Sequence, residues 1–309
     1  MFNPSPGPCR QFRQTRVLIV GCGDVGLRAA RQLLPRCRVM ALTSSADKLP
    51  GLRAQGVRPL LGNLDQPASL ARLSALAPYV LHLAPPPSSG GRDPRTRALL
   101  AALARRGQTR ALVYGSTTGV YGDAGGAWFD ETRAVAPATE RAHRRVDAEA
   151  HVRWWGRRAA LQWGTRASIL RIPGIYALDR EGGDPRDRVR RGSPLLVRED
   201  DVYTNHIQAD DLARACVAGL WRGRAQRVVH ACDDSDMRMG DYFDLVADLS
   251  GLPRLPRLTR QEAAAVLSPM QRSFMSESRR LGNQRLTQEL RVRLRWPDVR
   301  SVLQAGLQG

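Results

Sequence analysis

A short apolar segment that leads into a glycine-rich turn constrains the fold of this chain more than any other feature. Residues 17–20 read VLIV, residues 21–26 read GCGDVG, and an Ala- and Leu-rich helical pattern follows them. Glycine at the spaced positions permits a tight turn, close approach of the backbone to a pyrophosphate, and close packing of helix on strand. The helix N-terminus adds free N–H groups and a positive dipole end, which bind anions. The segment therefore predicts a dinucleotide-binding turn rather than a merely structural one.

Strand and helix patterns alternate beyond this turn, as a parallel sheet requires. The order indicates an α/β fold: a Rossmann-type doubly wound parallel sheet with a smaller, mixed C-terminal substrate-binding region. Residues 179–191 are predicted to be a charged loop. The predicted strands are residues 17–20, 38–42, 57–61, 79–83, 111–114, 168–171 and 227–231. The predicted later helices are residues 67–76, 95–106, 139–155, 212–221, 240–250 and 259–267.

The predicted domain boundaries follow from this alternation. Residues 1–14 are Pro-rich and polar without an apolar core, so we expect a disordered tail and no secretory signal. Residues 15–173 are expected to form an NAD(P)-binding Rossmann domain, to which residues 206–232 return. The substrate-binding region is expected to comprise residues 174–205 and 233–309.

Arginine supplies almost all of the positive charge. The chain has 48 Lys and Arg against 29 Asp and Glu, a formal net charge of +19, and Lys48 is its only lysine. The arginines are spread along the chain, whereas a nucleic-acid footprint clusters on one face or arm. This distribution argues against nucleic acid as a partner, although a basic surface still attracts anionic ligands. No run of eighteen apolar residues occurs, which argues against a membrane span.

The cysteines and histidines give no indication of a metal site. The 5 cysteines are scattered and form no CxxC pair, which argues against zinc and disulfides and favours a reducing cytoplasm. His206 lies close to Asp210 and Asp211, but one of these aspartates is expected to cap a helix rather than bind a metal. We therefore expect a cytoplasmic protein without a metal. We also expect a monomer or homodimer that acts on a small-molecule substrate.

Five stretches of sequence carry a resemblance to a known family. They are VLIVGCGDVG, VLHLA, YGSTTGVYGD, ILRIPGIY and TNHIQADDLA, in that order between about residues 16 and 232. Together they resemble the extended short-chain dehydrogenase/reductase superfamily, in its nucleoside-diphosphate-sugar epimerase group of NAD-dependent epimerases and dehydratases. The GxGxxG spacing departs from the GxxGxxG usual in that superfamily and points to an atypical branch.

The resemblance implies a catalytic set of a Ser or Thr, a Tyr, and a Lys four residues after the Tyr. It places Thr117, four residues before Tyr121, at the hydroxyl position. No Tyr-x-x-x-Lys occurs, because the only lysine lies far upstream. Counting back from Glu149, which matches a family glutamate, puts Arg141 and Arg145 at the Tyr and Lys positions.

These two arginines change the chemistry that the resemblance implies. Arg141 cannot replace a phenol, because a guanidinium does not deprotonate in proteins, whereas Arg145 can bind a ribose or phosphate. In an enzyme the proton would then pass through Thr117, Tyr121 or His143, or through a substrate-bound water. Each has a competing structural role: Thr117 as a turn cap, Tyr121 in packing, and His143 on a solvated helix face.

Small polar residues end the second predicted strand, at Thr43 and Ser44, where NAD enzymes place an acid for the ribose 2′-OH. With Arg28 or Lys48 nearby, these hydroxyls can accommodate a 2′-phosphate, which favours NADP over NAD. The resemblance places residues 63–64 beside the adenine. The predicted cofactor-binding residues are Gly21, Gly23, Asp24, Val25, Gly26, Thr43, Ser44, Asn63, Leu64, Ala84 and Arg145.

Two functions of different classes stay open. The first is an NAD(P)-dependent oxidoreductase or epimerase that acts on a hydroxyl or carbonyl of a substrate, nucleotide-linked or not. It is favoured by the STTGVYG turn and by a C-terminal third able to cover a substrate. The alternative is a catalytically degenerate dinucleotide-binding regulator or redox sensor, favoured by the missing YxxxK. The sequence does not predict the substrate.

Overall fold

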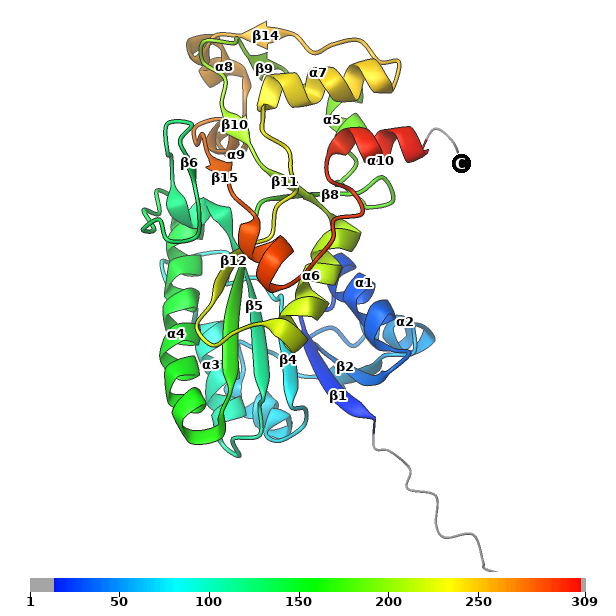
Figure 1. Cartoon of the computed structure of the whole chain (residues 1–309), viewed down its shortest axis with the longest axis vertical. Helices are drawn as coiled ribbons and strands as arrows, with labels where there is room; N and C mark the ends of the chain where they lie inside the picture. The colour runs from blue at the N-terminus through cyan, green and yellow to red at the C-terminus, as the bar shows by residue number, and fades with distance from the viewer. Residues whose placement is uncertain (1–13, 307–309) are drawn as a thin grey trace, which may run out of the picture.

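The central feature of the computed structural model, which describes residues 14–306, is a seven-stranded sheet (Figure 1). Its strands run in the order β12-β7-β5-β4-β1-β2-β3, and all neighbouring pairs are parallel. The predicted parallel sheet and Rossmann-type fold are therefore confirmed. The strands are β1 (Thr15–Val20), β2 (Cys37–Thr43), β3 (Arg58–Leu61), β4 (Tyr79–His82), β5 (Ala111–Thr117), β7 (Arg166–Ile172) and β12 (Val228–His230).

Helices cover both faces of this sheet because alternate strand residues point to opposite sides. In β1, Val17 and Ile19 pack with the buried side chains of α1 and α6, whereas Leu18 and Val20 pack with α3, α4 and η1. The sheet is thereby buried on both faces, as parallel sheets are. The helices are α1 (Asp24–Leu33), α2 (Lys48–Ala54), η1 (Pro67–Leu73), α3 (Pro94–Ala104), α4 (Glu140–Trp163) and α6 (Ala209–Arg222).

The C-terminal region lies over the carboxyl ends of the central strands (Figure 1). Its short strands pair in twos, β8 with β11, β9 with β14, β10 with β13, and β15 with β6. A separate apolar core, which includes Tyr242, Val246 and Val299, holds it together. Its elements are β8 (Gly174–Tyr176), α5 (Pro185–Arg190), β9 (Leu195–Leu196), β10 (Tyr203–Thr204), β11 (His206–Gln208), β13 (Met237–Arg238), α7 (Met239–Leu249), β14 (Arg257–Leu258), α8 (Arg260–Val266), α9 (Pro269–Phe274), β15 (Arg280–Leu281), η3 (Arg285–Glu289) and α10 (Val299–Gly306). The remaining elements are η2 (Thr118–Tyr121) and β6 (Trp128–Phe129).

The structure differs from the sequence-based prediction at several element boundaries. The predicted charged loop at 179–191 contains α5, because Asp184 accepts a hydrogen bond from the N–H of Arg186 and Pro185 stands at the first helical position. The predicted helix at 67–76 is a 3₁₀ helix. The predicted disordered tail, residues 1–14, lies outside the described residues except for Gln14. The division into two regions stays a prediction.

The predicted cap of the helix that follows β11, α6, is wrong. The side chain of Gln208, not of Asp210 or Asp211, accepts hydrogen bonds from the first free N–H groups of α6. The carboxylate of Asp211 instead accepts from the backbone N–H groups of Arg295 and Trp296, at 3.0 and 2.8 Å. Asp211 thereby joins the C-terminal segment to α6.

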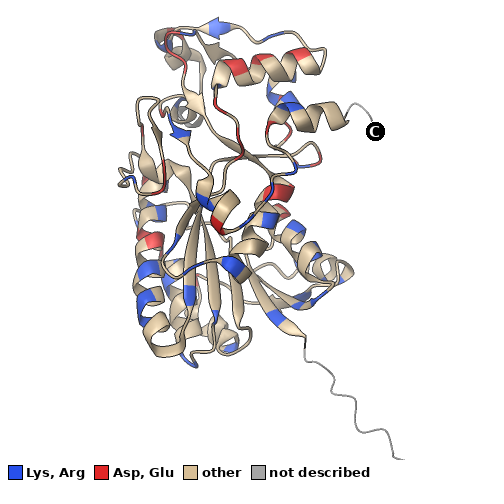
Figure 2. Cartoon of the chain, in the orientation of Figure 1, with Lys and Arg blue, Asp and Glu red and all other residues tan. Residues whose placement is uncertain are grey.

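Basic residues are distributed over many elements of both regions, with several along α4 (Figure 2). Among the described residues, no helix is long and apolar enough to cross a membrane. No group of three or more His, Cys, Asp or Glu within residues 14–306 is arranged to hold a metal ion.

Candidate functional site

The glycine turn lies between β1 and α1, at the point where the strand order of the sheet reverses. Open α/β sheets bind ligands at such a point, outside the carboxyl ends of the strands. Gly21 has a φ of +88°, and a Cβ there would lie 2.3 Å from the backbone nitrogen of Ala84. At Gly26 a Cβ would lie 2.9 Å from the carbonyl oxygen of Gly21. Both glycines are therefore required by the packing of the protein itself.

Gly23 is different, because a Cβ built on it would meet no heavy atom of residues 14–306 within 4 Å. It is the residue that caps α1, and the carbonyl of Gly23 accepts the first helical hydrogen bond, from Leu27 at 2.8 Å. The space in front of it is a cradle that any side chain would fill. This is the geometry that close approach of a pyrophosphate to the backbone requires.

Two cavities meet at this turn, with volumes of about 470 and 320 Å³. Gly21, Gly23 and Leu83 line both of them. Every predicted cofactor-binding residue lines one cavity or the other. The first cavity contains Gly21, Gly23, Thr43, Ser44, Asn63, Leu64 and Ala84, and the second contains Gly21, Gly23, Asp24, Val25, Gly26 and Arg145.

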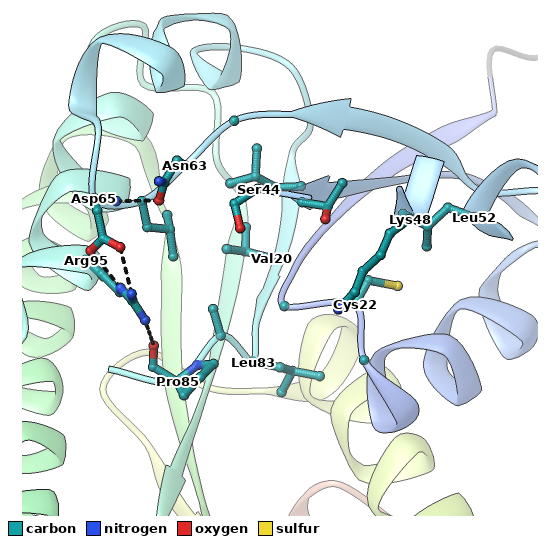
Figure 3. Close-up of a pocket in the computed structure, with 17 residues that line it drawn as sticks. Val20, Cys22, Ser44, Lys48, Leu52, Asn63, Asp65, Leu83, Pro85 and Arg95 are labelled. Carbon is teal, nitrogen blue, oxygen red and sulfur yellow. Dashed lines mark hydrogen bonds and ion pairs between the residues drawn. The ribbon is translucent and has the colours of Figure 1, made fainter. Parts of the chain in front are cut away.

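The first cavity extends from the turn to the ends of β2 and β3 (Figure 3). Ser44 is exposed beside it, and the side chain of Lys48 extends from α2 toward Cys22 in the turn (Figure 3). Burial raises the pKa of the Cys22 thiol to about 11. The opposite wall contains an ion pair that the sequence analysis missed, in which Arg95 donates to both Asp65 oxygens at 2.7 and 2.6 Å. These two residues are 30 positions apart, and no local pattern pairs them.

Arg28 does not take the role considered for it. Its side chain is only 7% exposed and donates to the carboxylates of Asp24, Asp210 and Asp179, at 2.9, 2.7 and 2.6 Å. It lines neither cavity. The prediction that Arg28 could accommodate a 2′-phosphate is therefore wrong, because its donors are used by acids from distant segments. Lys48 is the remaining candidate.

The second cavity lies at the ends of β5 and β7 and contains Thr117, Ser116 and Arg145. The Thr117 hydroxyl accepts a hydrogen bond from the N–H of Gly119 at 3.2 Å, so it caps the following turn while it faces the cavity. Arg145 donates to the carbonyl of Gly115 at 2.9 Å and to the Tyr114 hydroxyl at 3.1 Å. These bonds fix a guanidinium on the wall of the cavity that Thr117 also lines.

A buried ion pair lies next to the residues that line this cavity. Ser116 donates to Oε1 of Glu149 at 2.7 Å, and Arg171 donates to both oxygens of Glu149 at 3.0 and 2.7 Å. Glu149 and Arg171 are both buried. The pair therefore fixes Ser116, and with it the end of β5 that carries Thr117.

The other two predicted catalytic residues lie elsewhere. Tyr121 is fully buried, and its hydroxyl is 2.6 Å from Nε2 of His230. Burial raises the pKa of this phenol. His143 is exposed on α4 and does not line the second cavity. Of the three predicted catalytic residues, only Thr117 faces the space beside the glycine turn, because η2 turns Tyr121 into the core and α4 directs His143 to solvent.

The lining of the second cavity limits the chemistry it supports. Within the part of the chain that the structure describes, its lining contains no His, Tyr or Cys. The polar side chains there are Asp24, Ser116, Thr117, Arg145 and Arg180. Among the described residues, the cavity thus offers cationic donors, hydroxyls and one carboxylate, Asp24, whose Oδ1 accepts from Arg28 and whose Oδ2 has no hydrogen-bond partner.

Comparison with known proteins places these features in a wider context. The model of a family described as NAD(P)H-binding matches residues 21–220. No curated protein matches the sequence. A functionally unknown conserved protein from Silicibacter pomeroyi has a similar structure, with a TM-score of 0.79 and 30% sequence identity. The match covers 96% of this chain and 99% of that one.

Two structures of known activity share the fold at lower identity. A UDP-glucose 4-epimerase from Thermotoga maritima, solved with UDP-glucose, has a TM-score of 0.74 and 16% identity, covering 95% of this chain and 99% of that one. A double mutant of a dTDP-glucose 4,6-dehydratase from Streptomyces venezuelae, solved with NAD, has a TM-score of 0.72 and 18% identity, covering 94% and 96%. These likenesses confirm the fold of the epimerase and dehydratase group.

Proposed function

The chain belongs to the NAD(P)H-binding family, and we propose that it is an NADP-dependent reductase of a small-molecule carbonyl compound. The observation that carries the proposal is the pair of cavities that meet at Gly23. One contains Ser44 and Lys48, and the other contains Thr117 and Arg145. A dinucleotide bound along both would supply a hydride at the second cavity.

Reduction suits the second cavity better than oxidation or epimerisation does. Oxidation of a hydroxyl begins with loss of its proton to a base. The described lining holds no His, Tyr or Cys, and its carboxylate, Asp24, is paired with Arg28 and Arg180. Reduction of a carbonyl instead builds negative charge on oxygen. The Arg145 guanidinium stabilises such charge, and the Thr117 hydroxyl donates to the same oxygen and relays a proton from water. Carbonyls of nucleotide-linked sugars are included, because a UDP-glucose 4-epimerase of this fold was solved with UDP-glucose.

The first cavity favours a 2′-phosphate over a free ribose hydroxyl. The loop after β2 offers Thr43 and Ser44 rather than a carboxylate, and Lys48 extends along the cavity (Figure 3). Thr43 accepts from the N–H of Ser45 at 3.2 Å, whereas Ser44 is exposed. A lysine beside small hydroxyls attracts a phosphate dianion electrostatically.

We expect NADPH to bind more tightly than NADH, and Ser44→Asp to reverse this order, because a carboxylate repels the 2′-phosphate and accepts from a 2′-hydroxyl. Lys48→Met should weaken the binding of NADPH by about tenfold, the scale of one charged hydrogen bond. The affinity for NADH should not change. Calorimetric titration measures all of these dissociation constants. The isosteric control Ser44→Asn should retain the wild-type order. Equal affinities of the wild type for NADPH and NADH would refute the NADP assignment.

The activity itself is tested with NADPH and a panel of aldehydes, ketones and keto-sugar nucleotides. We expect Thr117→Val to lower kcat by about 100-fold, because proton transfer and oxyanion stabilisation are lost together. The dissociation constant for NADPH should hold, and Thr117→Ser should restore turnover. Thr287→Val, an exposed threonine outside both cavities, is the matched control. Unchanged kcat in Thr117→Val would exclude the assigned role.

A second function is favoured by the same lining. A cavity whose described residues include no His, Tyr or Cys also suits a dinucleotide-binding regulator that performs no chemistry. In that case NADPH binds and raises the melting temperature, and no carbonyl compound is reduced. The substrate panel therefore separates the two functions.

A further inference from the structure

An arginine from the C-terminal region reaches the glycine turn. Arg180 lies in the segment between β8 and α5, and it lines the second cavity together with Gly23, Asp24 and Val25. We propose that Arg180 binds an anionic group, a phosphate or a carboxylate, in front of the N-terminus of α1. This inference rests on the proposed function, because it assigns the C-terminal region a direct contact with the ligands of that site.

The segment that carries Arg180 is anchored to α1. The carboxylate of its neighbour Asp179 accepts from Arg28 at 2.6 Å, and the buried Arg28 side chain also binds Asp24 in α1 at 2.9 Å. Backbone hydrogen bonds from Gly183 to Arg180 at 2.9 Å and from Ala177 to Gly183 at 3.2 Å close the turn. The Arg180 backbone is therefore held at the edge of the cavity.

The guanidinium of Arg180 has donors to spare. Among the described residues, its Nη1 atom is buried and has no hydrogen-bond partner. Its Nε atom forms an ion pair with Oδ2 of Asp24 at 3.7 Å, too long for a hydrogen bond, so this carboxylate satisfies the guanidinium only in part. Buried polar groups without partners are rare in folded proteins and costly. Arg180 is therefore an incompletely paired cation on the wall of the cavity, and its exposed part is available to an anion.

The chemistry of the surroundings selects an anion. Among the described residues, the guanidiniums of Arg145 and Arg180 line the cavity together with the first N–H groups of α1, against one carboxylate, Asp24, that is already paired with Arg28 and Arg180. The planar fork of an arginine matches the paired oxygens of a phosphate or carboxylate. The side chain is 28% exposed, so a ligand can reach it. The anion has two possible sources with this chemistry: the pyrophosphate of the dinucleotide, or an acidic group of the substrate.

The test compares Arg180→Gln and Arg180→Lys with the matched control Arg190→Gln. Arg190 is 51% exposed, belongs to α5, and lines neither cavity. Calorimetry uses three probes: NADP⁺, adenosine 2′-monophosphate, which lacks the pyrophosphate, and inorganic phosphate added to NADP⁺-saturated protein. Circular dichroism and thermal unfolding establish that each variant is folded.

If the pyrophosphate is the partner, Arg180→Gln should weaken the binding of NADP⁺ by about 10- to 100-fold, the scale of a charge-assisted contact. Arg180→Lys should show an intermediate loss of affinity. Binding of adenosine 2′-monophosphate should not change. If a substrate anion is the partner, NADP⁺ affinity should hold, and the saturated variant should lose the phosphate binding that the wild type shows. Arg190→Gln should match the wild type throughout.

Wild-type affinity of Arg180→Gln for both NADP⁺ and inorganic phosphate would overturn the inference and leave the proposed function intact. Failure of the wild type to bind NADP⁺ would instead refute the proposed function. Inorganic phosphate is then titrated into the free protein, and equal binding by the wild type and Arg180→Gln overturns the inference in that case too.

Discussion

Replacement of Gly23 with valine is expected to abolish dinucleotide binding and to leave the chain folded. A Cβ at this position meets no atom of the described residues within 4 Å, so the fold has room for it. The same space is where a pyrophosphate would approach the N-terminus of α1. We expect the dissociation constant for NADPH to rise by at least about 100-fold, or ~2.7 kcal/mol. The melting temperature should fall only slightly, because valine is a poorer helix cap than glycine. Calorimetry and thermal unfolding measure the two quantities.

Other glycines provide the controls for this prediction. In Gly51→Val a Cβ also meets no atom of the described residues within 4 Å, and Gly51 lies outside both cavities, so binding should not change. Stability should hold or rise slightly, because glycine is the poorer residue inside a helix such as α2. Gly21→Ala should destabilise the fold, since its φ is +88° and its Cβ would lie 2.3 Å from the Ala84 nitrogen. Gly26→Ala should also destabilise it, through contact with the Gly21 carbonyl. Unchanged affinity in Gly23→Val would show that the pyrophosphate does not lie there.

Removal of the Glu149 carboxylate is expected to cause a large loss of stability. Glu149→Ala leaves the Arg171 side chain, which is only 3% exposed, without its bidentate partner. A buried charge that loses its partner costs about 3–5 kcal/mol. The same substitution removes the acceptor of the Ser116 hydroxyl beside the second cavity. Urea denaturation, followed by tryptophan fluorescence, measures the free energy of unfolding.

The matched control removes both charges. The double variant Glu149→Leu with Arg171→Met should recover most of the lost stability, because a buried ion pair replaced by apolar side chains of similar volume is often neutral. A loss below about 1 kcal/mol in Glu149→Ala, the range of an exposed pair, would show that water reaches Arg171 in the folded protein.

The sequence predicted the sheet because its signals are local. Each apolar strand stretch is bounded by a turn or helix signal, and the parallel strands had to be buried on both faces. All seven predicted strands of the sheet are present, and membership of the NAD(P)H-binding family confirms the predicted class of cofactor. The strands of the C-terminal region contain two or three residues each. Such segments carry too little periodicity to be recognised, and only their partners define them.

In the candidate site, too, the residues that the sequence predicted are those with a local signal. Gly21, Gly23 and Gly26 could be placed at a phosphate-binding turn, because backbone freedom and close approach are properties of the residues themselves. Ser44 and Lys48 could be placed beside it, because both lie in the segment that follows a predicted strand.

Only the tertiary structure decided which charged side chains remain available to a ligand. Arg28 is bound by Asp179 and Asp210, which are 151 and 182 positions away in the sequence. Tyr121 is turned into the core against His230, whereas Arg180 is brought to the glycine turn from the other region. Side chains with matching charge occur throughout an arginine-rich chain, and their pairing depends on distances in space that no local pattern encodes. The residues of the turn were thus determined by the sequence, and the charges that surround it by the fold.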